Sequence, residues 1–389
     1  MKKLLAPVVM LVLTSCAADG PRYSHVAFAS ASGVEDVLAA ARPTPTKDGR
    51  VVLITLDGVR AADVFDGADP SLKPGAKVAQ YKNPEALMPR TYALVKARGV
   101  ALGADRPGCG TVRTASGANV SLPGYLEIFT GRKTLCRDNA CAATDQTTVL
   151  DEAVDAGLYP VASIGSWQVL DHAVSSGKTN VLVAEGSRRW PGARPVMGGH
   201  LEELVVAGER SEAYPGHAGY RPDAYTAAIA LEYLRTQVPA MLHVGLGDTD
   251  EYAHQNQYAA YLDSLAKADA FIGKVADTLD TMGDIGKRTT VIVTTDHGRN
   301  ADFQHHGWAS AAAARTWVVA FGGRVAPQGV ACPKRDVTLA DIAPTVRELV
   351  GLPRDMHVEA GTPIEEVVGP DKVERVAGAA RVTGGRAER

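Results

Sequence analysis

The sequence lacks the features of several protein classes. It contains no close Cys-x-x-Cys pair, which disfavours a zinc site built on cysteine thiolates. Lys and Arg number 41 against 44 Asp and Glu, for a net charge of −3, and neither sign is gathered in long runs. Bulk electrostatics therefore indicates no nucleic acid partner. The composition, 46% hydrophobic and 22% charged residues, is that of an ordinary globular protein. The chain shows no internal repeat and is long enough for a sizeable core.

The chain begins with a short apolar run. Met1-Lys2-Lys3 precedes a run from Leu4 to Leu13 that is too brief to span a bilayer as a stable helix and is typical of an export signal. The residues that follow, Thr14-Ser15-Cys16, complete a pattern that resembles the bacterial lipoprotein signal, which implies that Cys16 is lipidated. We therefore expect a protein of the cell envelope, anchored to a membrane by acyl chains and facing the periplasm or the exterior. The alternative is a plain secretory signal with a chance cysteine.

The remaining four cysteines suit an oxidising compartment, where disulfides persist. Cys136 and Cys141 enclose only four residues, which suggests a small local bridge, and Cys109 and Cys332 are the pairing left over. Spacing alone proves neither bridge.

Apolar runs rich in Val and Ile alternate with helical patterns. This alternation predicts a mostly parallel sheet covered by helices on both faces, a three-layer α/β/α sandwich. Strands are expected at 51–56, 100–103, 161–164, 181–184, 241–246, 290–295 and 317–321, and helices at 85–98, 122–129, 148–156, 222–237, 257–282 and 339–349.

The expected organisation has one folded domain between two less ordered ends. The segments are a signal peptide with the lipidated cysteine (1–16), a tether (17–48), the folded domain (49–365) and a flexible tail (366–389). The stretch 166–220 fits the strand and helix rhythm poorly and is predicted to be an insertion on the substrate side of the site.

Acidic residues and histidines follow several of the predicted strands. Asp57 emerges from the first strand before a glycine, although such an aspartate can equally cap the next helix. Asp250 and His254 are four residues apart, so on a helical turn they share one face and could hold one cation, unless they only form a solvated, acidic helix start.

The next candidates follow the strand at 290–295. Asp296 and His297 are adjacent and need a turn at Gly298 to reach a common site. His305 and His306 follow in a short loop. Carboxylates and neutral imidazoles are the ligands that zinc accepts when no thiolate is available, and four to six of them would hold a pair of ions.

Ser121 precedes a Leu-Pro pair at the start of a predicted helix. Proline is well tolerated in the first helical turn, so Ser121 is expected at the N-cap, where its hydroxyl could satisfy only backbone N–H groups. A hydroxyl at a helix N-terminus also lies where the dipole favours an alkoxide or a phosphate oxygen. The sequence leaves both roles open.

The order of these motifs along the chain, over roughly residues 51–349, resembles that of the alkaline phosphatase superfamily. The nucleophile segment of its nucleotide pyrophosphatase/phosphodiesterase branch is similar to residues 121–131, Ser121-Leu-Pro-Gly-Tyr-Leu-Glu-Ile-Phe-Thr-Gly131. The resemblance implies an alkaline-phosphatase-like fold with two divalent metal ions, most simply zinc. One ion would be held by Asp57, Ser121, Asp296 and His297, and the other by Asp250, His254 and a histidine near 306. The His-Gly pattern selects His306 over His305.

The resemblance implies hydrolysis of small phosphate esters, monoesters or diesters, with Ser121 as nucleophile. Asn119, Arg113 or Arg132 could bind a phosphate oxygen. The segment after Gly298 departs from the usual diesterase form, which leaves the branch open, and the absence of Cys-x-Pro-x-Arg argues against a formylglycine sulfatase. The alternatives are a phosphoryl transferase or mutase of the same superfamily and a catalytically inactive, lipid-anchored binding protein.

Overall fold

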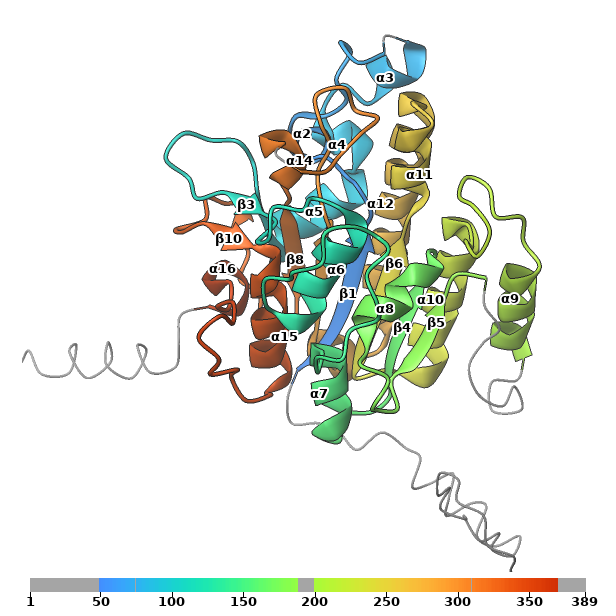
Figure 1. The fold of residues 1–389 in the computed structure, drawn as a ribbon, viewed down its shortest axis with the longest axis vertical. Helices are drawn as coiled ribbons and strands as arrows, with labels where there is room; N and C mark the ends of the chain where they lie inside the picture. The colour runs from blue at the N-terminus through green and yellow to red at the C-terminus, as the bar shows by residue number, and fades with distance from the viewer. Residues whose placement is uncertain (1–48, 74, 188–198, 309, 370–389) are drawn as a thin grey trace, which may run out of the picture. The chain divides into compact units, whose positions relative to one another are not determined.

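The computed structural model describes residues 49–73, 75–187, 199–308 and 310–369. Their centre is an eight-stranded sheet in the order β5-β4-β6-β1-β7-β8-β2-β9 (Figure 1). The strands are β1 (Arg50–Leu56), β2 (Gly99–Leu102), β4 (Val161–Gly165), β5 (Leu182–Glu185), β6 (Met241–Leu246), β7 (Thr289–Thr294), β8 (Val318–Gly322) and β9 (Gly329–Val330). A separate two-stranded sheet pairs β3 (Val112–Arg113) with β10 (Val337–Thr338).

The sheet is parallel except at β8. The central strand β1 runs parallel to β6 on one side and to β7 on the other, whereas β8 is antiparallel to both β7 and β2. Because β6, β1 and β7 are adjacent and parallel, their carboxyl ends meet at one edge of the sheet, where ligands bind in sheets of this kind.

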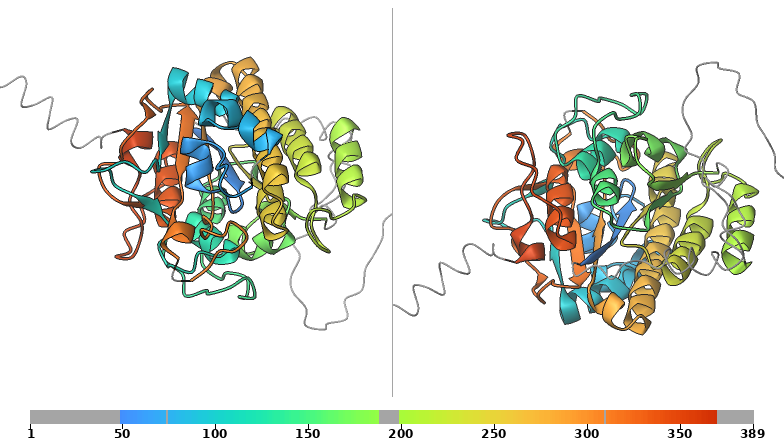
Figure 2. Two further views of the ribbon diagram at one scale, coloured as in Figure 1. Left: turned by 90° about the horizontal axis from the view of Figure 1, so that it is seen from above. Right: turned by 90° about the horizontal axis from the view of Figure 1, so that it is seen from below.

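Alternate residues of β1 face two different cores, as expected for a strand buried on both sides. Val52 and Ile54 pack in one core with α5 (Pro89–Arg98), α10 (Asp223–Gln237) and α12 (Tyr258–Thr281). Val51 and Leu53 pack in the other with α6 (Ser121–Thr130), α7 (Val149–Asp155) and α15 (Ile342–Val350). Figure 2 shows the sheet between these two helical layers, so the predicted three-layer sandwich is confirmed.

The remaining helices are short or peripheral. They are α2 (Ala61–Asp66), α3 (Ala76–Gln80), α4 (Pro84–Leu87), α8 (Asp171–Val174), α9 (Gly199–Glu209), α11 (Asp248–His254), α13 (Asp284–Lys287), α14 (Ala311–Ala314) and α16 (Glu365–Val368), with 3₁₀ turns at Gln168–Leu170 and Leu339–Asp341. Within the part of the chain that the structure describes, no helix combines the length and apolar composition needed to cross a bilayer.

One predicted boundary differs from the structure. The first residues of the predicted tail form α16, and Val367 is buried in the same core as α15, so the folded domain extends past 365. The predicted signal, tether and Cys16, and the tail beyond 369, lie outside the described residues.

The stretch 166–220 is only partly an insertion. It contains β5, which is an edge strand of the main sheet, and α9, which packs against α10. His200 and Leu204 of α9 line a groove of about 550 Å³ with α10 and α12, and Ser121 is not among the residues of that groove. The end of the stretch does approach α11, because Gln255 donates a hydrogen bond to the Pro215 carbonyl.

Both cysteine pairs form disulfides. Cys109–Cys332 joins residues separated by 223 positions, and Cys136–Cys141 joins residues separated by five. The long bridge restricts the unfolded chain far more than the short one in the chain-entropy description of cross-links.

We therefore expect unequal losses of stability when the bridges are removed. Replacing Cys109 and Cys332 together with serine should lower the free energy of unfolding by roughly 2–5 kcal/mol, and the Cys136/Cys141 double variant should lose clearly less. Urea unfolding of both double variants measures the difference. Equal losses would show that loop length does not set the contribution of these bridges.

Candidate metal centre

Three chain segments deliver carboxylates to the same edge of the sheet. Asp57 directly follows β1, Asp296 lies two residues beyond β7, and Asp250 lies in α11, which starts just after β6. The segments are tied together by hydrogen bonds, from the Gly58 N–H to Asp296 Oδ1 at 3.0 Å and from the Thr249 hydroxyl to the Asp57 carbonyl at 2.6 Å. The Asp57 and Asp296 side chains are buried, and that of Asp250 nearly so.

Glycines permit this close approach. Gly58 has φ +63°, and a Cβ there would lie 2.4 Å from Asp250 Oδ1. Gly298 was predicted to permit a turn, but its φ is not positive. Glycine is needed there because a Cβ would lie 2.4 Å from the Arg315 carbonyl oxygen.

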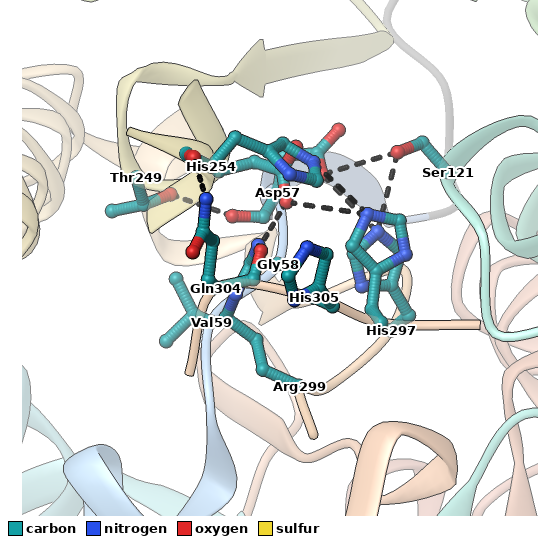
Figure 3. A network of polar contacts seen from close by, with 12 residues as sticks. Asp57, Gly58, Val59, Ser121, Thr249, His254, His297, Arg299, Gln304 and His305 are labelled. Atoms are coloured by element: carbon teal, nitrogen blue, oxygen red, sulfur yellow. Dashed lines mark hydrogen bonds and ion pairs between the residues drawn. The ribbon is translucent and has the colours of Figure 1, made fainter. Parts of the chain in front are cut away.

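Ser121 is the first residue of α6, which corrects its predicted N-cap position. The N-cap is Val120, which has an extended backbone with φ −133° and ψ 151°. The helix therefore begins at Ser121, one residue earlier than predicted. The hydroxyl is therefore free to face the site. It donates to Asp57 Oδ1 at 3.3 Å and lies 3.2 Å from His297 Nε2 (Figure 3).

Two groups of candidate ligands result. In the first, ligand atoms of Asp57, Asp296 and His297 lie within 4.8 Å of one another, with Ser121 beside them. In the second, His306 Nε2 lies 3.1 Å from His254 Nε2, which is 3.0 Å from Asp250 Oδ2. His297 also lies within 4.8 Å of Asp250 and His306, so the two groups adjoin.

The direction of the imidazole hydrogen bonds fits these groups to cations. His297 Nδ1 lies 2.8 Å from the Gly298 carbonyl oxygen, and His306 Nδ1 lies 2.9 Å from that of Asn119. A carbonyl only accepts, so both Nδ1 atoms carry the hydrogen and both Nε2 lone pairs face the site. In the first group the lone pair meets carboxylate oxygens, and Asp296 Oδ2 is buried without a hydrogen-bond partner among the described residues. Lone pairs and carboxylate oxygens that face one another in this way suit a bound cation.

The electrostatics of the site agree with this interpretation. Burial raises the pKa of Asp57 well above its usual value, and Asp296 and Asp250 raise it further. Burial also raises the pKa of Asp296 to about 7 and lowers that of His297 to about 4, which keeps the imidazole neutral. A cluster of buried carboxylates with neutral imidazoles is the donor set expected for zinc or a similar divalent ion.

The structure separates the two loop histidines. The His305 side chain is 63% exposed and pairs with Asp302 at 2.8 Å, whereas the His306 side chain is 8% exposed and faces His254. This arrangement supports the choice of His306 as the candidate ligand.

Alanine substitutions provide a matched test of this choice. His306→Ala should weaken zinc binding at the second group by at least about 100-fold, the upper end of losses seen even for outer partners of a metal. His305→Ala should leave zinc binding near that of the unchanged protein. Zinc titration with a competing chelator measures both, and the reverse ranking would contradict the assignment.

The predicted phosphate-binding residues are engaged elsewhere. The Asn119 side-chain amide donates to the carbonyls of Gly307 and Ser310, Arg113 is exposed and 3.5 Å from Asp336, and Arg132 pairs with Asp355 at 2.7 Å. Asn119 nevertheless borders the site, through its backbone contact with His306. Contact of Asn119 or Arg113 with substrate stays a prediction.

Two residues at the site were missed by sequence reasoning. The buried Arg299 guanidinium contacts Asp250 and is held by the carbonyls of Phe303 and Gln304. Burial alone would raise the pKa of Asp250, but Arg299, His254 and His306 together outweigh burial and hold this pKa well below the usual value. The Tyr125 hydroxyl donates to Asp57 Oδ2 at 3.2 Å. Arg299 follows Asp296-His297-Gly298 and Tyr125 lies one helical turn after Ser121, so proximity in sequence was the available signal.

Comparison with known proteins agrees with the fold and the donor set. The family model of the metalloenzyme superfamily matches residues 191–354. A 2,3-bisphosphoglycerate-independent phosphoglycerate mutase of Haloarcula marismortui is 27% identical over 49% of this chain, and rat steryl-sulfatase is 31% identical over 28%. These matches span only 37% and 22% of the two relatives' own length.

A solved structure extends the likeness to most of the chain. The phosphonate monoester hydrolase of Silicibacter pomeroyi covers 83% of this chain, over 77% of its own, with a TM-score of 0.54 at 16% identity. At that identity the likeness concerns the fold. The chain is thus similar to the alkaline phosphatase-like metalloenzymes in its fold and, over residues 191–354, in its sequence.

Proposed function

We propose that this protein is a metal-dependent hydrolase that cleaves phosphate esters with Ser121 as nucleophile between two zinc ions. The observation that carries the proposal is the position of the Ser121 hydroxyl, 3.3 Å from Asp57 Oδ1 and 3.2 Å from His297 Nε2. The same hydroxyl starts a helix of ten residues, whose dipole favours negative charge at that end.

Each group of candidate ligands would hold one of the two ions. Asp57, Asp296 and His297 would hold one ion beside Ser121, and Asp250, His254 and His306 would hold the second. Bound divalent ions supply positive charge that lowers the proton affinity of a nearby hydroxyl and stabilises charge on phosphoryl oxygens. The protein's own part is to fix the Ser121 oxygen for attack along the line opposite the leaving group.

The reaction would proceed in two displacements. In the first, the bond from Ser121 Oγ to phosphorus forms, the bond from phosphorus to the ester oxygen breaks, and the alcohol leaves with the proton lost by serine. In the second, water replaces the serine oxygen at phosphorus, which releases phosphate or a phosphate monoester and returns the proton to Ser121.

A substrate panel tests the proposal. Chromogenic phosphate monoesters, phosphate diesters and sulfate esters are incubated with purified protein, with and without a chelator. We expect release from a phosphate ester that the chelator abolishes and added zinc restores. Turnover of the sulfate ester alone, or turnover insensitive to the chelator, would contradict the proposal.

Phosphoryl transfer is the second candidate, because one of the matched relatives is a mutase. In that reaction the phosphoryl group on Ser121 passes to an alcohol instead of water. Including an acceptor alcohol in the same assay distinguishes the outcomes, since transfer yields a new phosphate ester and hydrolysis yields free phosphate.

The location in the cell envelope, with Cys16 lipidated, belongs to the same proposal. The two disulfides support an oxidising compartment. Metabolic labelling with a radioactive fatty acid tests the anchor, and an unlabelled protein, or a Cys16→Ser variant labelled like the unchanged protein, would contradict it.

A further inference from the structure

A line of buried polar side chains crosses the otherwise apolar sheet and ends at the candidate nucleophile site. Its members come from four neighbouring strands and from α6: Glu185 of β5, Ser163 of β4, His243 of β6, Thr55 of β1 and Tyr125. We call these five residues the buried relay. All are at most 2% exposed.

The contacts along the buried relay are continuous. Ser163 Oγ lies 2.5 Å from Glu185 Oε1 and 2.6 Å from His243 Nδ1. His243 Nε2 lies 2.9 Å from Thr55 Oγ1. The Thr55 hydroxyl interacts with the Tyr125 hydroxyl, which in turn donates to Asp57 Oδ2.

The sheet is built to hold these groups. Ser163 lies opposite His243 in the β4–β6 pair, and Glu185 lies opposite Gly165 in the β4–β5 pair. A Cβ at Gly165 would come within 2.0 Å of Glu185 Oε2, so only glycine leaves room for the carboxyl group. The His243 ring also packs edge-on against Phe129, with centroids 4.8 Å apart.

The residues of the buried relay have too few hydrogens to form all of its hydrogen bonds. From Asp57 to Glu185 there are five links, and each link needs one hydrogen. The three hydroxyls and a neutral imidazole supply four. When Asp57 is ionised as a metal ligand it supplies none, so a complete chain needs one more hydrogen, on either His243 or Glu185.

Burial decides where this hydrogen resides. Burial raises the pKa of Glu185 to about 7, and Asp171 raises it too, against the opposing effects of the Ser163 hydrogen bond and of Arg221. Burial lowers the pKa of His243 to about 3. Glu185 Oε2 has no hydrogen-bond partner among the described residues. A buried oxygen without a partner costs less free energy in a neutral carboxylic acid than in a charged carboxylate.

We propose that the buried relay stores one proton on Glu185 and thereby holds Tyr125 as a hydrogen-bond donor to Asp57. Its members are positioning residues that act on Asp57 through Oδ2, whereas Ser121 contacts Oδ1. The proposal rests on the proposed function, because it takes Asp57 as an ionised ligand. When Glu185 loses its proton, Thr55 turns its hydrogen toward His243, and Tyr125 loses the donor that polarises it.

The variant Glu185→Gln provides the test, because a glutamine amide donates to Ser163 Oγ at every pH. In metal-free full-length protein, stabilisation from the Glu185 proton is complete at low pH and is lost as the pH rises through about 7, since the folded-state pKa lies above the usual 4.5. The melting temperature of the unchanged protein should therefore fall between pH 5 and 8 relative to that of Glu185→Gln. Infrared spectra of the zinc-loaded protein at pH 6, in which Asp57 is ionised, should show a carboxylic acid band that the variant lacks.

Zinc affinity tests the link to Asp57. Tyr125→Phe should bind zinc roughly 10-fold more weakly than the unchanged protein, the lower end of losses for outer partners of a metal. The ratio of zinc affinities, unchanged protein over Glu185→Gln, should fall several-fold between pH 6 and 8. Absence of the acid band, or a ratio that does not change with pH, overturns the proposal.

These readouts are independent of turnover. The melting curves come from metal-free protein and the band from zinc-loaded protein, and neither needs a substrate, so they test the stored proton even if no phosphate ester is cleaved. Loss of the proposed function would instead appear as an inactive unchanged protein in the substrate panel.

Discussion

Replacing Ser121 with alanine is expected to lower kcat for phosphate ester cleavage by about 10³-fold or more, because the proposed attacking oxygen is removed. Zinc binding should survive, since Asp57, Asp296 and His297 keep their contacts. Steady-state kinetics and metal analysis on the same preparation measure the two effects. Thr281→Ala is a matched control that removes an exposed hydroxyl at the end of α12, ahead of the amino end of β7 and so across the sheet from the site.

The comparison between these variants decides the role of Ser121. Kinetics of Thr281→Ala should equal those of the unchanged protein. Retained turnover in Ser121→Ala would remove the serine from the mechanism and leave the metal site with a different nucleophile.

Replacing Asp296 with asparagine is expected to change activity and ion-free stability in opposite directions. The substitution removes a buried carboxylate whose charge disfavours the ionisation of Asp57. Metal-free protein should therefore melt at a higher temperature or unchanged, while turnover falls by about 100-fold or more through loss of a ligand. Thermal unfolding with and without zinc, beside the substrate assay, measures both.

Zinc itself provides the internal control. At a zinc concentration of 100 times Kd, binding should stabilise the unchanged protein by about 2.7 kcal/mol per site, and Asp296→Asn should gain less. Asp277→Asn, on the exposed side of α12, should behave like the unchanged protein. Equal zinc stabilisation in all three proteins would show that Asp296 is not a ligand.

The strands around the site could be predicted because they are buried on both faces. Continuous apolar runs at 51–56, 241–246 and 290–295 are the sequence signature of central parallel strands, and the structure has strands there. The direction of β8 could not be predicted, because a short antiparallel strand of four apolar residues has the same sequence pattern as a parallel strand. The helix start at Ser121 was misplaced by one residue, since a small polar residue before Leu-Pro fits the cap and the first helical position equally well.

The candidate ligands could be predicted as residue types, but their partners could not. Asp57 and Asp296 follow strands that only the sheet order makes adjacent. Arg299 and the buried relay were missed because each depends on contacts between distant segments: Thr55 meets His243 across 188 positions, and nothing local distinguishes either residue from an ordinary strand residue. The separation of His305 from His306 likewise required the loop's conformation.

The most direct test of the account is to locate the metal ions in zinc-loaded crystals by anomalous diffraction at the zinc absorption edge. The account predicts two peaks per chain, one at Asp57, Ser121, Asp296 and His297 and one at Asp250, His254 and His306. Peaks at other residues, or none at this edge of the sheet, would contradict it.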